Sequence, residues 1–105
     1  GATEVYFAVA CPPVISPCFY GVDMPTRKEL IANKKSVEEI KRHLEVDQLM
    51  YQDIDALSEA VMRKGDHHID QPCMACFDKN YITKEMDVDR INELEEMRIK
   101  DRNGK

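Results

Sequence analysis

The sequence predicts an α/β fold in which short strands alternate with helices along the chain. Residues 4–10, Glu-Val-Tyr-Phe-Ala-Val-Ala, are almost continuously apolar and rich in β-branched and aromatic side chains, which is typical of a strand buried on both faces of a parallel sheet. A second candidate strand covers residues 48–51. Helical patterns lie between and after these strands, giving the order strand, helix, helix, strand, helix. Because two strands alone do not form a stable open sheet, we expect one end of a larger domain.

A long irregular loop is predicted after the first strand. Pro12 and Pro13 end the strand, and residues 12–25 carry no helical or strand pattern before Pro25. Loops of this length usually have a function or lie against other structure.

Two capping boxes predict helices between the strands. They are Thr26 with Glu29 and Ser36 with Glu39, in which the glutamate follows the hydroxyl residue by three positions. We expect a short helix at residues 30–32 after the first box. The second helix would bury a stripe of Val37, Ile40 and Leu44.

Two more helices are predicted after the second strand. Asp53 is the expected cap of the first, which carries Ile54, Leu57 and Val61 on one face, and Gly65 is its expected end. The last helix begins at about residue 87. Its expected apolar stripe is Val88, Ile91, Leu94 and Ile99, with a solvated charged face opposite.

Composition limits the classes of function. A chain of 105 residues is one domain or part of one. Fifteen basic and twenty acidic residues give a net charge of −5, which does not favour a nucleic-acid surface. No apolar stretch approaches the roughly 20 residues of a membrane helix, and no signal peptide is evident. Cysteines in such a chain favour a reducing compartment, by default the cytoplasm. The start at Gly1-Ala2 suggests a cloning remnant or a fragment boundary.

The pair Cys73-Met74-Ala75-Cys76 is the sharpest local motif. Two intervening residues let both sulfurs face one ion or cluster. A zinc half-site, an iron–sulfur half-site, a redox pair and a chance pair remain open. His67 and His68 could complete a zinc site, although a solvated histidine pair is the plainer interpretation. Cys11, at the end of the strand, is interpreted as core packing.

Two segments carry a resemblance to a known family. Residues 16–32, Ser-Pro-Cys-Phe-Tyr-Gly-Val-Asp-Met-Pro-Thr-Arg-Lys-Glu-Leu-Ile-Ala, and residues 73–77, Cys-Met-Ala-Cys-Phe, resemble the C-terminal portion of amidophosphoribosyltransferases. Residues 36–40 and 52–57 continue in the family's order. The similarity covers about residues 1–85, and the tail at 81–98 looks more like members that lack a metal cluster.

The resemblance implies a fold and a reaction. Residues 1–64 would be the end of a phosphoribosyltransferase-type parallel-sheet domain with flanking helices, and residues 65–105 a C-terminal extension with the CxxC pair and a helix. Family members are cytosolic, often homotetrameric, and inhibited by purine nucleotides. They convert phosphoribosyl pyrophosphate, bound with Mg, and glutamine to phosphoribosylamine, glutamate and pyrophosphate, the first step of de novo purine synthesis.

The resemblance also implies site residues. One branch of the family carries a [4Fe–4S] cluster on four cysteines, of which three match Cys18, Cys73 and Cys76, with the fourth outside this chain. With three thiolates, the isolated chain is expected to hold the cluster weakly or not at all. Tyr20 and Asp23 match positions near the ammonia path, as does Leu30. In the plainer interpretation, Asp23 is a turn residue and Leu30 packs in the core.

The catalytic motifs of the family are missing. A phosphoribosyltransferase loop needs adjacent acidic residues and a Gly/Thr-rich turn, whereas Asp53 and Asp55 are separated. Residue 1 is Gly, not the nucleophilic cysteine of the glutaminase domain. We therefore expect no catalytic residue here, an inactive chain by itself, and the remainder of its own polypeptide as partner, with substrates and inhibitors bound mainly elsewhere.

Two other functions remain possible from sequence. The first is a small stand-alone zinc- or iron–sulfur-binding module built on the CxxC pair with Cys18 or the histidines. The second is a redox protein, which is the weakest because no helix signal directly follows Cys73 to lower its pKa.

Overall fold

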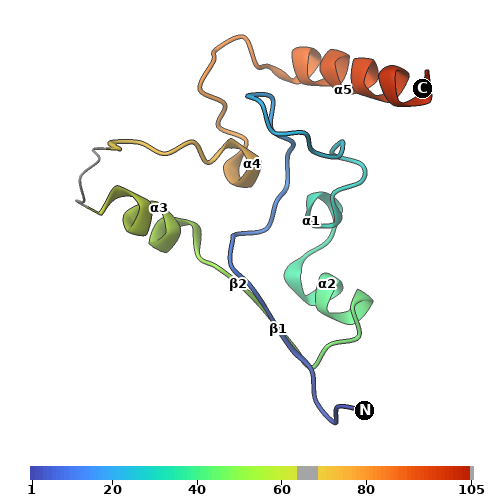
Figure 1. The fold of residues 1–105 in the computed structure, drawn as a ribbon, viewed down its shortest axis with the longest axis vertical. Helices are drawn as coiled ribbons and strands as arrows, with labels where there is room; N and C mark the ends of the chain where they lie inside the picture. The colour runs from blue at the N-terminus through green and yellow to red at the C-terminus, as the bar shows by residue number, and fades with distance from the viewer. Residues whose placement is uncertain (64–68, 105) are drawn as a thin grey trace.

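A two-stranded parallel sheet joins distant parts of the chain in the computed structural model, which describes residues 1–63 and 69–104. Strand β1 (Tyr6–Val9) pairs with β2 (Gln48–Tyr51). Tyr6 lies opposite Gln48, and Val9 lies opposite Tyr51. The connection between the strands passes through two helices (Figure 1). The predicted order of elements and the mixed α/β character are therefore confirmed.

The capping box at Ser36 is confirmed. Helix α1 (Ile31–Lys34) is followed by α2 (Val37–His43). The Ser36 hydroxyl accepts the Glu39 N–H at 3.3 Å, and the Glu39 carboxylate accepts the Ser36 N–H at 2.7 Å. These bonds satisfy two donors that would otherwise be free at the helix start. Ile40 of this helix is 1% exposed, which makes it the most deeply buried hydrophobic residue of the core among the described residues.

The box at Thr26 forms a turn and does not start a helix. The Glu29 carboxylate accepts both the N–H and the hydroxyl of Thr26 at 2.7 Å, and the Glu29 N–H closes a turn onto the Thr26 carbonyl. Leu30 is in an extended conformation and is the N-cap of α1. The prediction of a helix directly after this box is wrong in detail, because Leu30 separates the turn from α1.

Three more helices follow β2 among the described residues. Helix α3 (Ile54–Met62) is capped by Asp53, as predicted, and its expected end at Gly65 lies outside the described residues. The four-residue helix α4 (Ala75–Asp78) contains the second cysteine of the CxxC pair. Helix α5 (Val88–Asn103) is capped by Asp87, close to the predicted start. Within residues 1–63 and 69–104, every helix is too short or too polar to cross a lipid bilayer.

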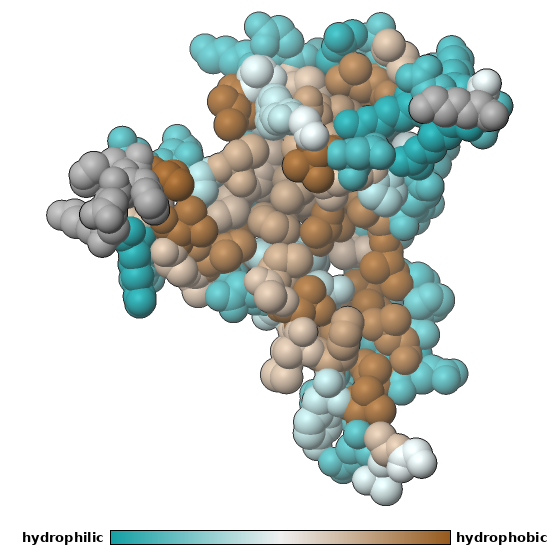
Figure 2. All heavy atoms as spheres, viewed as in Figure 1, coloured by the Kyte–Doolittle hydropathy of each residue, from teal (hydrophilic) through white to brown (hydrophobic). Residues whose placement is uncertain are grey.

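The prediction that residues 4–10 are buried on both faces is wrong for this chain. Tyr6 is 62% exposed and Phe7 is 49% exposed, because the described helices leave the faces of β1, to which its side chains point, largely uncovered. Figure 2 shows exposed apolar residues over this part of the molecule. The radius of gyration is 16.5 Å, compared with about 13 Å for a compact domain of this length. The buried hydrophobic residues that form the core of the described chain are Ile40, Leu49, Ala75 and Ile91.

The predicted apolar stripe of α5 is wrong in part. Ile91 is buried, but Val88 is 66% exposed and Ile99 is 41% exposed. Glu95, a charged residue between the stripe positions Leu94 and Ile99, is 8% exposed. The reason is that α5 packs over the loop and turn at residues 18–29 (Figure 1), which present backbone carbonyls and a guanidinium rather than an apolar surface.

Candidate functional site

The CxxC segment lies against the loop that contains Cys18. The carbonyl of Cys76 accepts the N–H groups of Ile15 at 2.9 Å and Ser16 at 3.1 Å. These two hydrogen bonds place α4 beside Ser16, which precedes Cys18 by two residues in the sequence (Figure 1). The two segments that the sequence singled out, far apart along the chain, are therefore neighbours in space.

Tyr81 is a second connection between these segments. Its hydroxyl donates to the Pro17 carbonyl at 2.7 Å and lies 2.6 Å from the Ser16 hydroxyl. Because the single phenolic proton goes to Pro17, the Ser16 hydroxyl donates to Tyr81. The ring centroids of Phe19 and Tyr20 lie 5.5 and 6.1 Å from that of Tyr81. Partial burial raises the pKa of Tyr81 above its ordinary value, so the phenol stays protonated and keeps donating at neutral pH.

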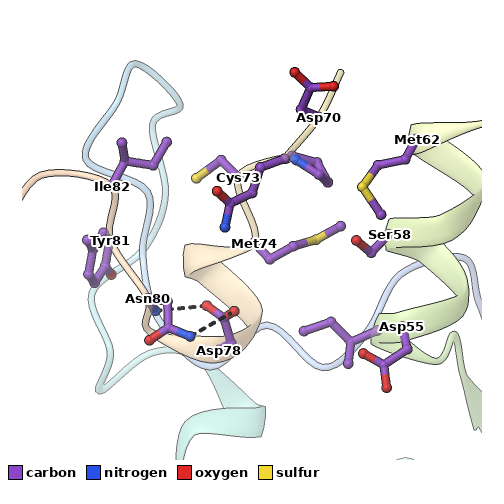
Figure 3. A pocket seen from close by; sticks show the side chains of 13 residues that line it. Asp55, Ser58, Met62, Asp70, Cys73, Met74, Asp78, Asn80, Tyr81 and Ile82 are labelled. Carbon is purple, nitrogen blue, oxygen red and sulfur yellow. Dashed lines mark hydrogen bonds between the residues drawn. The ribbon is translucent and has the colours of Figure 1, made fainter. Parts of the chain in front are cut away.

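The thiols lie in one neighbourhood without forming a metal site. Burial raises the pKa of Cys76, and the neighbouring thiols of Cys73, Cys18 and Cys11 add to that rise. The Cys18 sulfur accepts the Tyr20 N–H at 3.3 Å. Cys73 is exposed, and its sulfur points away from α3 (Figure 3). In the part of the chain that the structure describes, no three His, Cys, Asp or Glu side chains converge on one point as a metal requires.

The fit of an iron–sulfur cluster is therefore partial. The donors Cys18, Cys73 and Cys76 are of the right type, and backbone contacts place their segments side by side. Their sulfurs do not converge in this conformation, and the chain supplies no fourth matching thiol. The alternative zinc donors His67 and His68 lie outside the described residues.

A short helix does begin just after Cys73, at Ala75, contrary to the sequence prediction. Helix α4 starts at Ala75, with Met74 as its N-cap. A redox-active thiol needs a lowered pKa, whereas burial raises the pKa of Cys76. The helix therefore gives the redox interpretation no support.

An open groove of about 840 Å³ lies between α3 and the CxxC segment (Figure 3). Its walls mix apolar side chains such as Met62 and Met74 with carboxylates. The Asp78 carboxylate in this wall is already engaged, accepting the Asn80 N–H at 2.8 Å. No sequence pattern predicted the groove, because its two walls come from segments with unrelated patterns.

The other three predicted site residues are spread over the loop and the start of α1. The Tyr20 hydroxyl lies 3.0 Å from the Thr83 hydroxyl and accepts the Thr83 N–H at 3.2 Å. The Asp23 side chain is 93% exposed and lies 4.0 Å from Arg102. Leu30 is half-buried at the N-cap of α1. The structure holds Tyr20 in place and leaves Asp23 open to solvent.

Three residues that the sequence analysis missed fix α5 on this site. The Glu95 carboxylate accepts the Arg27 N–H at 2.7 Å and the Arg27 guanidinium at 2.9 and 3.1 Å. Arg98 donates to the Cys18 carbonyl at 2.7 Å, and its guanidinium lies 4.8 Å from the centroid of the Phe19 ring. The sequence did contain a signal for the position of two of these residues. Glu95 and Arg98 follow Ile91 at positions i+4 and i+7, so they lie on the same face of the helix as this predicted core residue.

Comparison with curated proteins gives consistent matches. The chain is 42% identical over 84 residues to the amidophosphoribosyltransferase of Bacillus subtilis (strain 168), covering 80% of this chain and 18% of that enzyme. It is 38% identical over 98 residues to the Pasteurella multocida enzyme, covering 93% and 19%. It is 42% identical over 81 residues to a chloroplastic amidophosphoribosyltransferase of Glycine max, covering 77% and 14%.

The chain is homologous to amidophosphoribosyltransferases. This confirms the resemblance inferred from residues 16–32 and 73–77. The chain spans less than a fifth of the length of these amidophosphoribosyltransferases. No protein-family model matches it.

Proposed function

We propose that the chain is the C-terminal portion of an amidophosphoribosyltransferase, structural rather than catalytic in itself. The complete enzyme would convert phosphoribosyl pyrophosphate and glutamine to phosphoribosylamine, glutamate and pyrophosphate. The observation that carries this proposal is the match of 80% of the chain to about a fifth of the Bacillus subtilis enzyme. Phosphoribosyl pyrophosphate with Mg, glutamine and inhibitory purine nucleotides would bind mainly outside this chain.

The open sheet supports a structural role in a larger domain. Tyr6 and Phe7 of β1 are about half exposed or more, and Met50 of β2 is 52% exposed. Apolar strands of this kind belong inside a parallel sheet covered on both faces. The remainder of the same polypeptide is the proposed cover, and it would complete a phosphoribosyltransferase-type sheet to which residues 1–64 contribute. Residues 65–105 would be an extension that packs back on the loop.

Cys18, Cys73 and Cys76 are the proposed ligands for three positions of a [4Fe–4S] cluster. When bound, the cluster would cross-link the loop to the CxxC segment and so stabilise the domain. The chain's own residues already make that connection by hydrogen bonds, through the Cys76 carbonyl and the Tyr81 hydroxyl. Rearrangement of these three side chains and a fourth cysteine from the rest of the polypeptide would complete the site.

Tyr20, Asp23 and Leu30 are proposed to line or support a passage for ammonia between two active sites. The exposure of Asp23 and the partial burial of Leu30 are compatible with a surface that the rest of the enzyme covers. A homotetramer in the cytoplasm completes the proposal. The Glycine max relative is named as chloroplastic, so the compartment varies among relatives.

Metal analysis and activity together test this function. The complete polypeptide should form phosphoribosylamine from glutamine, and residues 1–105 alone should not. An isolated chain that binds one zinc ion per molecule with high affinity would instead support a stand-alone metal module. Activity of the isolated chain would overturn the structural role.

A further inference from the structure

We infer that Arg98 of α5 is a positioning residue that holds together the two ends of the loop at residues 18–24. This loop carries Cys18, Tyr20 and Asp23. A role of Arg98 in the enzyme therefore rests on the proposed function, whereas the contacts of Arg98 with the loop are independent of it.

The two ends of the loop meet at one guanidinium. Arg98 donates through Nη2 to the Cys18 carbonyl at 2.7 Å and through Nη1 to the Met24 carbonyl at 3.4 Å. The Cys18 N–H also points to the Met24 sulfur at 3.2 Å. Arg98 therefore bridges the residue where the loop begins and the residue where it ends.

This bridge matters because the loop has no regular hydrogen bonding of its own. Backbone carbonyls that are removed from water need a donor, and residues 12–25 form neither helix nor strand. Tyr81 supplies a donor to Pro17, and Arg98 supplies one to the next carbonyl, that of Cys18. Two consecutive backbone carbonyls, those of Pro17 and Cys18, thus accept hydrogen bonds from side chains of the C-terminal segment.

Arginine suits this position better than lysine. Its planar guanidinium presents several donors in fixed directions, so it can reach two carbonyls at once and stack on a ring. The Phe19 ring lies 4.8 Å beneath it, within the range of a cation–π contact. A lysine ammonium could keep the Cys18 contact and would lose the bridge geometry.

Helix α5 does not depend on Arg98 for its own attachment. Glu95 holds Arg27 by three hydrogen bonds, and Ile91 is buried. Removing the Arg98 side chain should therefore loosen the loop while leaving the helix in place. This separation makes the inference testable.

The test is hydrogen exchange measured by mass spectrometry on the complete polypeptide that contains this chain, comparing Arg98→Met with wild type. The amides of Cys18 and Tyr20, both hydrogen-bonded to sulfur, should exchange about tenfold faster, in line with the loss of hydrogen bonds from a charged donor. Arg98→Lys should restore part of the protection. The matched control is Arg90→Met on the same helix, because Arg90 pairs with the exposed Glu93 instead of the loop.

Unchanged exchange at residues 18–24 in Arg98→Met would overturn the inference. So would an equal increase in Arg90→Met, or an increase of the same size at residues 37–51, since either would indicate general loosening. Faster exchange with an unchanged ratio of glutamine consumed to phosphoribosylamine formed would support the positioning by Arg98. The same result would count against the role proposed for the loop in the enzyme.

Discussion

The Glu95 carboxylate lies 2.9 Å from the guanidinium of Arg27, 68 residues earlier in the chain. Both groups are largely buried, with side-chain exposures of 11% and 24%. Burial alone would raise the pKa of Glu95, but the hydrogen bonds and charge of Arg27 outweigh it and lower the pKa. Glu95 is therefore ionised at neutral pH and attaches α5 to the turn before α1.

Glu95→Gln should destabilise the chain by about 2 kcal/mol, because it removes a charged acceptor from a largely buried guanidinium. Urea denaturation at pH 7 measures the change in the free energy of unfolding. Glu96→Gln, an exposed neighbour on the same helix, is the control and should have little effect. Equal losses in the two variants would mean that the Glu95–Arg27 contact does not stabilise the fold.

The same pair predicts an acid-sensitive stability. Since the folded-state pKa of Glu95 lies below its ordinary value of 4.5, its contribution is fully present above that value and is lost as the pH falls through the folded-state pKa. Unfolding free energies measured from pH 6 downward should fall less steeply below about pH 4.5 in Glu95→Gln than in wild type. Parallel pH profiles would contradict this assignment.

Tyr81→Phe should loosen the connection between the CxxC segment and the loop. It removes the donor to the Pro17 carbonyl and the partner of the Ser16 hydroxyl, which is 1% exposed. We expect a loss of about 1–2 kcal/mol in unfolding free energy. Tyr6→Phe removes an exposed hydroxyl bonded to Glu4 and should be nearly neutral. The prediction is wrong if the two substitutions cost the same.

Leu30→Ala in the complete enzyme tests the proposed ammonia passage. Glutamine hydrolysis should continue while phosphoribosylamine formation falls, so that the ratio of glutamate to phosphoribosylamine rises. Ile31→Ala, the next residue on α1 and 37% exposed, is the control and should leave the ratio unchanged. If both rates fall together in Leu30→Ala, this residue serves packing only.

Substituting the proposed ligands tests the cluster. Cys18→Ala, Cys73→Ala and Cys76→Ala should each lower the iron content and visible absorbance of the complete polypeptide. Cys11→Ala should retain both. The isolated chain should be colourless or lose iron quickly. Four iron atoms held stably per isolated chain would show that no outside ligand is needed.

Local signals predicted most of the secondary structure. The box at Ser36, the cap at Asp53 and the strand at residues 48–51 depend on neighbours within a few positions, and all were found. The box at Thr26 failed as a helix start, because the extended conformation of Leu30 follows it. Short-range rules identify a cap and do not tell whether the chain continues as a helix.

The contacts of the site were only partly predictable. The sequence directed attention to Cys18 and the CxxC pair, and the structure brings their segments together. Glu95 shares a face of α5 with Ile91, but a charged residue is expected to be buried only when it has a partner, and the sequence alone does not identify Arg27 as that partner. Which face of α5 is buried depends on the surface it meets, and that surface is formed by turn residues such as Arg27 rather than by an apolar sheet.

The two open edges of the sheet formed by β1 and β2 affect how the isolated chain behaves in solution. The backbone N–H and C=O groups along the outer sides of β1 and β2 meet no third strand within the described residues, and unpaired strand edges readily recruit other extended chains. At high concentration the isolated chain should therefore self-associate edge to edge and precipitate. Short peptides that mimic an adjoining strand should keep it in solution.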